Sequence, residues 1–486
     1  MKKAKIISLV MALATLFSVT LPVYAGEAPA YDYSVMPISE VYDDYSTSLI
    51  SEDDIMLISP NPMEKPDTIT VVLNGETIDF TDDAGNKVDP QLVNDRTMVP
   101  VRKIFEVLGA TIAWDGETET VTATTEEKTM KLQINNNVAT VTTGELTEEL
   151  TLDAAPVVID GRTLVPVRFI SETLGLKVGW DDPTQTVIIM DTGIILEILK
   201  EEAPTFYAMI TEETVPVKTA EMDFDIDGTL KYTHTEDKTN NSNIKFALTG
   251  LLKIAEKAIG MDIDYKVTGK GAIYDMMKEN RMEKATMETI LDIENPAVYV
   301  KSSLIESEVG NKWVKETYED IEEAMDMSAL EQMQVAADPE QRLQDAIDAM
   351  FDLMVLTPTT YQEVEMFTKL ACMFINDDYM SVSGRATKTY KYEISVKDVE
   401  EILSNMGLGE IGLSEMLKDT KLTFTSKYAN GLNTEATLGL DVYMEYDDEI
   451  VDLDMTITGK MDKVNETVTV KIPAEKDVIL MNEIVE

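Results

Sequence analysis

One stretch of sequence occurs twice, and this duplication constrains the fold more than any other feature of the chain. The two copies read Arg96-Thr97-Met98-Val99-Pro100-Val101-Arg102 and Arg162-Thr163-Leu164-Val165-Pro166-Val167-Arg168. When residues 96–124 are aligned with residues 162–190, fifteen of the twenty-nine positions are identical. Self-similarity of this kind indicates a repeated structural unit. The front of the chain therefore holds two copies of one small unit.

Each copy predicts a helix, a strand, a turn and a second strand. Pro100 and Pro166 are expected at the first helical position, where the missing N–H would have no partner. Gly109 and Gly175 are expected to end the helices, because glycine readily adopts positive φ. The segments around Trp114 and Trp180 alternate apolar and polar residues, as strands do. With the hairpin expected at residues 69–80, the two copies predict one α+β domain over residues 68–191.

The side chains that the two copies share are expected to be structural. Arg102 and Glu106, like Arg168 and Glu172, are four residues apart and can form ion pairs on a helix, with a clamp for a carboxylate ligand as the alternative. Trp114 and Trp180 are expected in the core, with sugar stacking as the alternative. The predicted structural motif comprises Arg96, Pro100, Arg102, Glu106, Gly109, Trp114, Arg162, Pro166, Arg168, Glu172, Gly175 and Trp180. No catalytic, cofactor-binding or metal-binding residue is assigned.

The amino terminus predicts export from the cell. Lys2, Lys3 and Lys5 precede an apolar run over residues 6–21 and a small residue, Ala25, which together are typical of a signal peptide over residues 1–25. No later apolar run is long enough to span a bilayer, and no cysteine near the cleavage point suggests a lipid anchor. Residues 26–67 mix Pro, Ser, Tyr and acids and predict a disordered acidic linker. The protein is therefore expected outside the cell, free or held at its surface.

Charge and rare residues exclude several functions. The chain has 41 Lys and Arg against 90 Asp and Glu, a formal net charge of −49, which repels nucleic acid and anionic lipid headgroups. Weak binding of divalent cations stays open as an alternative. The single cysteine, Cys372, is expected to be a buried apolar residue. The single histidine, His234, is expected in a solvated loop, because nothing in the sequence supplies a nucleophile or an orienting partner.

The rest of the chain predicts a mainly antiparallel sheet interrupted by helices. Residues 192–218 form a helical connection, and residues 219–486 form a β-rich domain in which apolar and polar residues alternate over several runs, as in a sheet with one wet face. Asp338 and Ser395 begin two predicted helices. The 29 Met residues, including Met276, Met277 and Met282 and the pair Met325 and Met327, are expected to fill the core, with a Met-lined apolar cavity or a cuprous site as alternatives.

The doubled motif, followed in each copy by Gly and then Trp-Asp, resembles the copper amine oxidase N-terminal domain, a stalk module of many secreted proteins of Gram-positive bacteria. The resemblance implies a non-catalytic module without copper or quinone. A copper amine oxidase needs three imidazole ligands, and this chain has one histidine. The segments Ala297–Lys301, Lys312–Lys315 and the expected last strand Val468–Pro473 more faintly resemble the half-barrel sheets of envelope lipoproteins and lipoprotein carriers.

The sequence therefore predicts a secreted, non-enzymatic protein of the cell envelope. In the leading hypothesis the stalk module presents the β-rich domain to another envelope protein or surface component. In the alternative hypothesis the β-rich domain carries an apolar small molecule or lipid on its sheet. A hydrolase with paired carboxylates has no positive support in the sequence.

Overall fold

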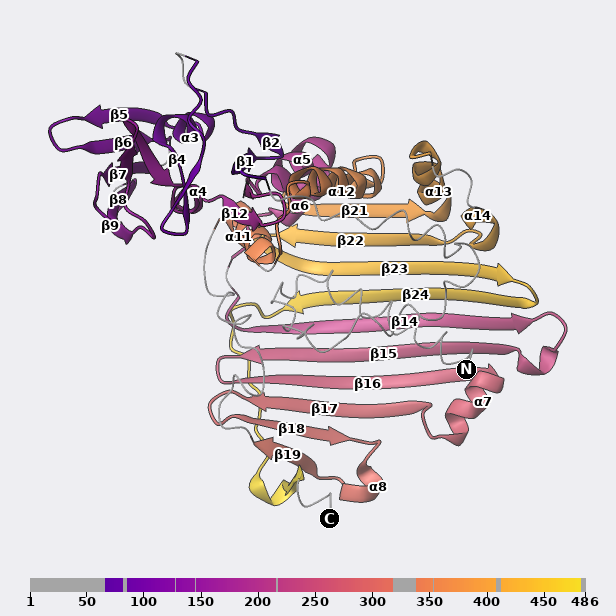
Figure 1. Cartoon of the computed structure of the whole chain (residues 1–486). Coiled ribbons are helices and arrows are strands. Elements are labelled where there is room, and N and C mark those ends of the chain that lie inside the picture. The colour runs from indigo at the N-terminus through magenta and orange to yellow at the C-terminus, as the bar shows by residue number, and fades with distance from the viewer. Residues whose placement is uncertain are drawn as a thin grey trace, which may run out of the picture. The chain divides into compact units, whose positions relative to one another are not determined.

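A computed structural model shows that the chain forms two compact units (Figure 1). The structure describes residues 66–81, 85–126, 128–144, 146–215, 217–317, 338–352, 354–407 and 412–481. The motif unit comprises the described residues of 66–198 and 343–369, and the sheet unit comprises those of 199–342 and 370–481. The predicted signal peptide, nearly all of the predicted linker, and Met325 and Met327 lie outside the described residues. The motif unit thus combines the duplicated sequence with a segment from far along the chain.

The predicted order of elements is confirmed in both copies of the motif. The first copy contains α3 (Val101–Val107), β5 (Thr111–Asp115) and β6 (Thr120–Thr124). The second copy contains α4 (Val167–Thr173), β12 (Lys177–Asp181) and β13 (Thr186–Met190). Gly109 and Gly175 follow the helices with φ of 75° and 89°, as predicted. Both helices are only two turns long, so packing against the sheets must stabilise them.

The two prolines occupy a different position from the one predicted. Pro100 and Pro166 end the strands β4 (Arg96–Pro100) and β11 (Arg162–Pro166), and each is the N-cap of the following helix. The two strands pair with each other antiparallel, with Val99 opposite Val165. Both valines are completely buried. The shared sequence therefore forms the strand pair that joins the two copies. The prediction that it begins a helix did not include this pairing.

The strands of the motif unit form three small sheets. β1 (Thr70–Leu73) and β2 (Glu76–Thr77) form the predicted hairpin, and β1 also pairs in parallel with β13 of the second copy. In the first copy, β5 and β6 are extended by β7 (Lys128–Gln133), β8 (Val138–Thr143) and β9 (Leu146–Thr151). β3 (Gln91–Val93) and β10 (Val157–Ile159) flank the central β4–β11 pair. A single apolar core, which includes Ile104, Phe105 and Ile170, joins the two copies.

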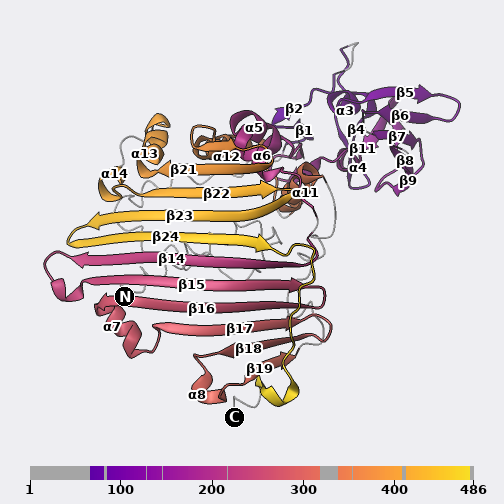
Figure 2. The same cartoon turned by 180° about the vertical axis from the view of Figure 1, so that it is seen from behind.

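The sheet unit is built on one twelve-stranded sheet in the order β20-β21-β22-β23-β24-β14-β15-β16-β17-β18-β19-β25 (Figures 1 and 2). The neighbouring strands pair antiparallel, except that β19 and β25 are parallel. The predicted α+β class with a large antiparallel sheet is confirmed. The strands are β14 (Ala220–His234), β15 (Ser242–Ala255), β16 (Ala258–Gly271), β17 (Lys284–Asp292), β18 (Ala297–Ser302), β19 (Trp313–Thr317), β20 (Met380–Ser383), β21 (Thr387–Ser395), β22 (Lys421–Ala429), β23 (Leu432–Tyr446), β24 (Glu449–Asp462) and β25 (Val478–Leu480).

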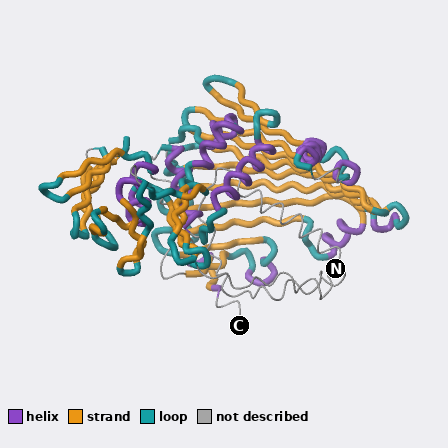
Figure 3. Tube along the Cα trace, turned by 45° about the horizontal axis from the view of Figure 1, so that its top comes forward, coloured by secondary structure: helices purple, strands orange, loops and turns teal. Residues whose placement is uncertain are grey.

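Besides α3 and α4, the described residues form eight α-helices (Figure 3). The predicted helical connection contains α5 (Ile194–Glu202) and α6 (Pro204–Ile210), and the two predicted helices are α11 (Pro339–Asp352) and α13 (Val396–Asn405). Ser395 and Asp398 form a reciprocal capping box on α13. The sequence reading missed α7 (Ala272–Glu279), α8 (Glu306–Val309), α12 (Thr360–Ile375) and α14 (Leu413–Met416).

Two local predictions about the second half are wrong. His234 is the last residue of β14, opposite Glu449, and is half-buried rather than in a solvated loop. Residues 468–473 make no strand, although Val470 and Ile472 pack against the apolar cluster of Ile290, Tyr299 and Trp313. Apolar residues alternate with polar residues there because the segment packs against the sheet, although it does not form one of its strands. The pair β18 and β19, in contrast, confirms the predicted return at residues 297–315.

Candidate functional site

A polar hollow of about 630 Å³ lies beside the second copy of the motif, and we name it the Trp180 hollow. One wall comes from the end of α4 and from β12, and the other from the end of α11 and the residues that follow it. All of the lining residues belong to the motif unit. The residues are Arg168, Glu172, Gly175, Leu176, Lys177, Val178, Gly179, Trp180, Asp348, Phe351, Asp352, Met354, Val355 and Leu356.

Charged side chains of both signs line this hollow. Arg168 Nε lies 3.8 Å from Glu172 Oε1, which gives the predicted pair a long contact, and Lys177 Nζ lies 2.6 Å from Asp352 Oδ1. Burial raises the pKa of the Glu172 carboxyl, an effect that Arg168 and Lys177 partly oppose. The hollow is therefore lined by both hydrogen-bond donors and hydrogen-bond acceptors.

The second wall is held in place by contacts to the middle of β12, to a residue just after β13 and to the turn between β1 and β2. Leu356 is 6% exposed and packs on Gly179, so closely that a Cβ at position 179 would lie 2.7 Å from Leu356 Cβ. Thr192 donates a hydrogen bond to the carboxylate of Asp348. Gln362 Nε2 donates to the Gly75 carbonyl at 3.1 Å. The hydrogen bonds that hold the second wall thus join residues 156 and 287 positions apart in sequence, which no local pattern predicts.

The first copy of the motif has a different environment. Trp114 is 52% exposed, so its prediction as a core residue is wrong, whereas Trp180 packs partly against the apolar core. Arg102 and Glu106 are exposed, and among the described ion pairs none joins them. Arg96 Nε pairs with Asp153 Oδ2 at 2.7 Å, and Arg162 also has a partner. The shared motif is therefore structurally equivalent in the two copies but differs in what surrounds it.

A second candidate surface is one face of the twelve-stranded sheet, which we name the apolar face. The register places Ile226 of β14 opposite Leu248 of β15 and Ile457 of β24, so these side chains share one face. Most of the apolar side chains in its centre are half-buried rather than buried. These are Met222, Phe224, Ile226, Leu230 and Tyr232 on β14, Phe246, Leu248, Leu252 and Ile254 on β15, Met261, Ile263 and Tyr265 on β16, Val442 and Met444 on β23, and Val451, Ile457 and Met461 on β24.

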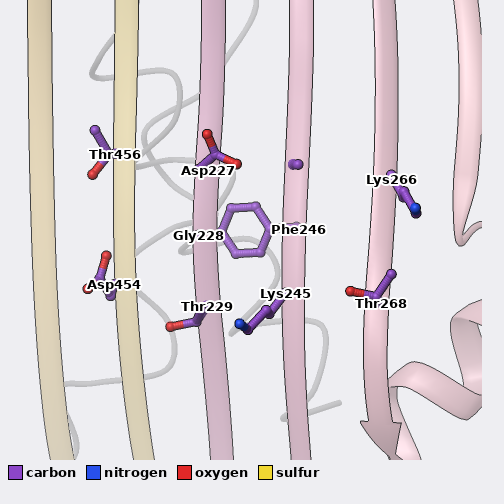
Figure 4. A pocket seen from close by; sticks show the side chains of 10 residues that line it. Asp227, Gly228, Thr229, Lys245, Phe246, Lys266, Thr268, Asp454 and Thr456 are labelled. Carbon is purple, nitrogen blue, oxygen red and sulfur yellow. The ribbon is translucent and has the colours of Figure 1, made fainter.

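The opposite face of the sheet is polar, as the alternating sequence predicted. Asp223, Asp225 and Asp227 of β14 are exposed on it. A shallow hollow of about 420 Å³ on the sheet is bordered by Asp227, Asp454, Lys245 and Lys266, whose side chains Figure 4 shows around it. Charges of both signs and several threonines surround this hollow, and it is open to solvent. We read it as an ordinary gap between side chains on a wet face.

Helices cover one end of the apolar face. The Tyr390 hydroxyl and Lys388 Nζ of β21 both donate to the Glu212 carboxylate, which follows α6. Tyr392 donates from its hydroxyl to the Phe374 carbonyl of α12 at 2.9 Å. Cys372 on the same helix is 2% exposed, and burial raises the pKa of its thiol, which confirms the prediction of a buried apolar residue. The covered strand β21 thus differs from the half-buried centre of the face.

The structure accounts for the single histidine and places two of the clustered Met residues at the surface. The Asp237 carboxylate accepts hydrogen bonds from Thr239 and Asn240 within its own turn, and His234 Nδ1 accepts one from the Asp237 N–H at 3.0 Å. Met276 and Met282 are 47% and 52% exposed, so these two do not fill the core. Within the described ranges, no three His, Cys, Asp or Glu side chains are grouped so as to hold a metal ion.

The solved structures that are distantly similar to this chain include three with low scores. A β-barrel-like protein of a domain of unknown function from Brucella abortus is 8% identical, with 52% of this chain and all of that chain covered and a TM-score of 0.09. OpdQ of Pseudomonas aeruginosa is 9% identical over 71% of this chain and 80% of its own, with a TM-score of 0.09. MucB in complex with MucA(peri) is 10% identical over 58% and 100%, with a TM-score of 0.06. Such low scores carry no argument about fold or function.

Comparison with curated proteins finds no match to this chain. Among the described residues, no helix is both long and apolar enough to cross a membrane. One family model does match: residues 72–189 fit the copper amine oxidase N-terminal domain, and the match does not extend to the catalytic domain of those oxidases. The duplicated sequence is therefore similar to that non-catalytic, stalk-like module, as its two Pro-containing motifs predicted.

Proposed function

We propose that this chain is an exported, non-enzymatic binding protein whose sheet unit holds an apolar ligand against the apolar face. The signal-like sequence at residues 1–25 supports export, and the match over residues 72–189 supports a scaffolding role for the motif unit. The observation that most supports the proposal is the row of half-buried apolar side chains across β23, β24, β14, β15 and β16. Contiguous apolar surface of this kind marks binding sites on soluble proteins.

The chemistry of the face favours a flexible, uncharged ligand. Met222, Met261 and Met461 contribute unbranched thioether side chains, which adapt to ligands of different shape. A ligand that covers about 300 Å² of apolar surface would gain roughly 7 kcal/mol before the costs of association are subtracted. The net charge of −49 opposes ligands with anionic headgroups. An uncharged lipid or another apolar small molecule fits these conditions best.

The first test is mass spectrometry of the purified full chain, both intact under native conditions and after extraction with organic solvent. A bound apolar molecule at near-stoichiometric level is the expected result. The second test is titration with N-phenyl-1-naphthylamine, a neutral probe that becomes fluorescent in apolar surroundings. Saturable binding is expected. Empty protein together with no saturable binding of the probe would overturn the proposal.

The strand β15 offers a matched pair of variants for this titration. Leu248 lies on the apolar face, and its neighbour Thr249 is exposed on the polar face. Leu248→Glu and Leu248→Gln should weaken binding of the probe, because each places a polar group in the site. Thr249→Glu should leave binding unchanged. Circular dichroism of all three variants controls for folding, and equal binding by Leu248→Gln and Thr249→Glu would contradict the assignment to this face.

A macromolecular partner is the second candidate, and exposed apolar side chains on the motif unit favour it. Met350 is 51% exposed, Val355 86%, Met366 55% and Phe367 59%. Exposed apolar surface is a feature of protein interaction sites. On this hypothesis Phe367→Glu should reduce retention of the protein on isolated cell envelopes, whereas Lys369→Glu, on the same helix, serves as a control for added negative charge.

A further inference from the structure

The Trp180 hollow exists beside the second copy of the motif because one segment from far along the chain supplies its second wall. Asp348, Phe351 and Asp352 come from the end of α11, and Val355 and Leu356 follow it. The two copies differ in their tryptophans, since Trp114 is 52% exposed and Trp180 is half-buried, whereas Arg168 and Glu172 are exposed like Arg102 and Glu106. The chain thus has two near-identical motifs, and only the second lines this hollow together with residues of the distant segment. Its volume of about 630 Å³ is within the range of small-molecule sites.

The charges around the hollow select an uncharged polar ligand. Arg168 and Lys177 supply N–H donors, and the carboxylates of Glu172, Asp348 and Asp352 supply acceptors. The positive and negative side chains are nearly equal in number. The hollow would therefore not neutralise the charge of a strongly anionic or a strongly cationic ligand. The chain as a whole carries −49, which adds a penalty for anions. Hydroxyl groups both donate and accept, and they can bond to all five of these side chains.

The remaining lining residues supply apolar contact. Trp180 contributes an indole whose N–H already donates to Asp182 Oδ1 at 3.3 Å, which fixes the ring. Val355, at 86% exposure, and Met354, at 45%, stand on the opposite wall. A ligand that combines several hydroxyls with an apolar C–H face matches a site with a fixed aromatic ring and many polar groups. Sugars have this combination.

We propose that the Trp180 hollow is a binding site for an uncharged saccharide. This site is separate from the apolar face, and its occupation would give the motif unit a means of holding the protein on a glycan-containing surface. The assignment goes beyond the proposed binding of an apolar ligand and does not depend on it. Both copies of the motif keep their structural role, and only the second copy gains a ligand.

The test is isothermal titration calorimetry of the full chain with neutral trisaccharides: cellotriose, maltotriose and the trimer of N-acetylglucosamine. Saturable binding of at least one of them is expected. Arg168→Ala should raise its Kd by about tenfold, because a hydrogen bond from a charged donor is lost. Arg102→Ala, the same change in the first copy, should leave Kd unchanged. The pair isolates the hollow from any general effect of removing an arginine from the motif.

Two further variants keep the result independent of folding. Val355→Trp alters a highly exposed side chain, so the fold should tolerate it, and the larger ring should fill the hollow and abolish saccharide binding. Trp180→Ala should weaken binding and Trp114→Ala should not, with thermal unfolding of each followed in parallel. Two results would each overturn the proposal: no binding of any of the three trisaccharides, or binding that survives both Arg168→Ala and Val355→Trp.

Discussion

The ring of Phe246 on β15 occupies the space above Gly228, its direct partner on β14. A Cβ built at position 228 would lie 2.3 Å from Phe246 Cζ. The relationship is repeated four residues away, where Phe224 of β14 covers Gly250 of β15, with a Cβ at 250 lying 2.0 Å from Phe224 Cζ. Each glycine on one strand is thus covered by an aromatic ring from the other. These two pairs fix the register of the two central strands of the sheet.

Gly228→Ala should destabilise the sheet unit by roughly 1–3 kcal/mol, because the new methyl group forces Phe246 out of its position. The measurement is equilibrium denaturation followed by circular dichroism. Gly116→Ala serves as a control, since only Trp114 Nε1, at 3.5 Å, lies near the Cβ position there. Equal stability of the two variants would show that the ring moves without strain.

Leu356→Ala should destabilise the motif unit by roughly 2–5 kcal/mol, the usual range when a large buried side chain is truncated. Leu356 is 6% exposed and packs on Gly179, whereas its neighbour Val355 is 86% exposed. Val355→Ala should therefore change stability by less than about 0.5 kcal/mol. Thermal unfolding of the two variants compares them directly, and a similar loss in both would mean that the wall of the hollow is not anchored by Leu356.

Ser395→Ala should reduce stability by about 1 kcal/mol, because Ser395 accepts from the Asp398 N–H and the capping box of α13 is broken. Ser404→Ala on the same helix changes an exposed residue and should have little effect. Chemical denaturation of both variants tests the difference. If Ser404→Ala proved the more destabilising of the two, the cap would not be the source of the stability.

The sheet unit should lose stability in strongly alkaline solution through Tyr392. Burial raises the pKa of its hydroxyl to about 12 from the ordinary value of 10.0. The folded state holds this proton more tightly than the unfolded state, so the contribution is complete below pH 10 and is lost as pH rises through about 12. Tyr392→Phe should remove this step from an ultraviolet titration of tyrosinate. The same variant should unfold with a weaker dependence on pH in that window, and an unchanged titration curve would contradict the assignment.

Glu172 should show the opposite behaviour to an ordinary ion-paired carboxylate. Partial burial raises the pKa of its carboxyl, so the folded state favours the protonated form and deprotonation opposes folding as pH rises from the ordinary pKa through the folded one. The side chain is 55% exposed, so solvent screening keeps this effect small. Glu172→Gln should therefore be slightly more stable than the parent chain at pH 7 and equal to it in acid, where both side chains are neutral. Differential scanning calorimetry at pH 7 and pH 4 tests this. A loss of stability at pH 7 would show that the pair with Arg168 outweighs the burial.

The sequence by itself determined many of the local elements, although it did not predict helices such as α7 and α12. Alternation identified strands such as β14 and β24 because one face of the sheet is wet, and the positive φ at Gly109 and Gly175 follows from the missing side chain. The duplication predicted two equivalent units, and the family match over residues 72–189 confirmed the resemblance. These features depend on neighbours in the chain, and short-range patterns record them.

Only the tertiary structure decided which parts of the chain those elements pair with and pack against. Pro100 and Pro166 end a pair of strands that join the two copies, although a proline before a helix is usually its first residue. Trp114 and Trp180 share one motif, but β12 is walled by residues from position 348 onward and β5 is not. β14 pairs with β24 across more than two hundred residues. Such contacts depend on which surfaces remain uncovered once the local elements form, and that is a property of the packed chain and not of any segment within it.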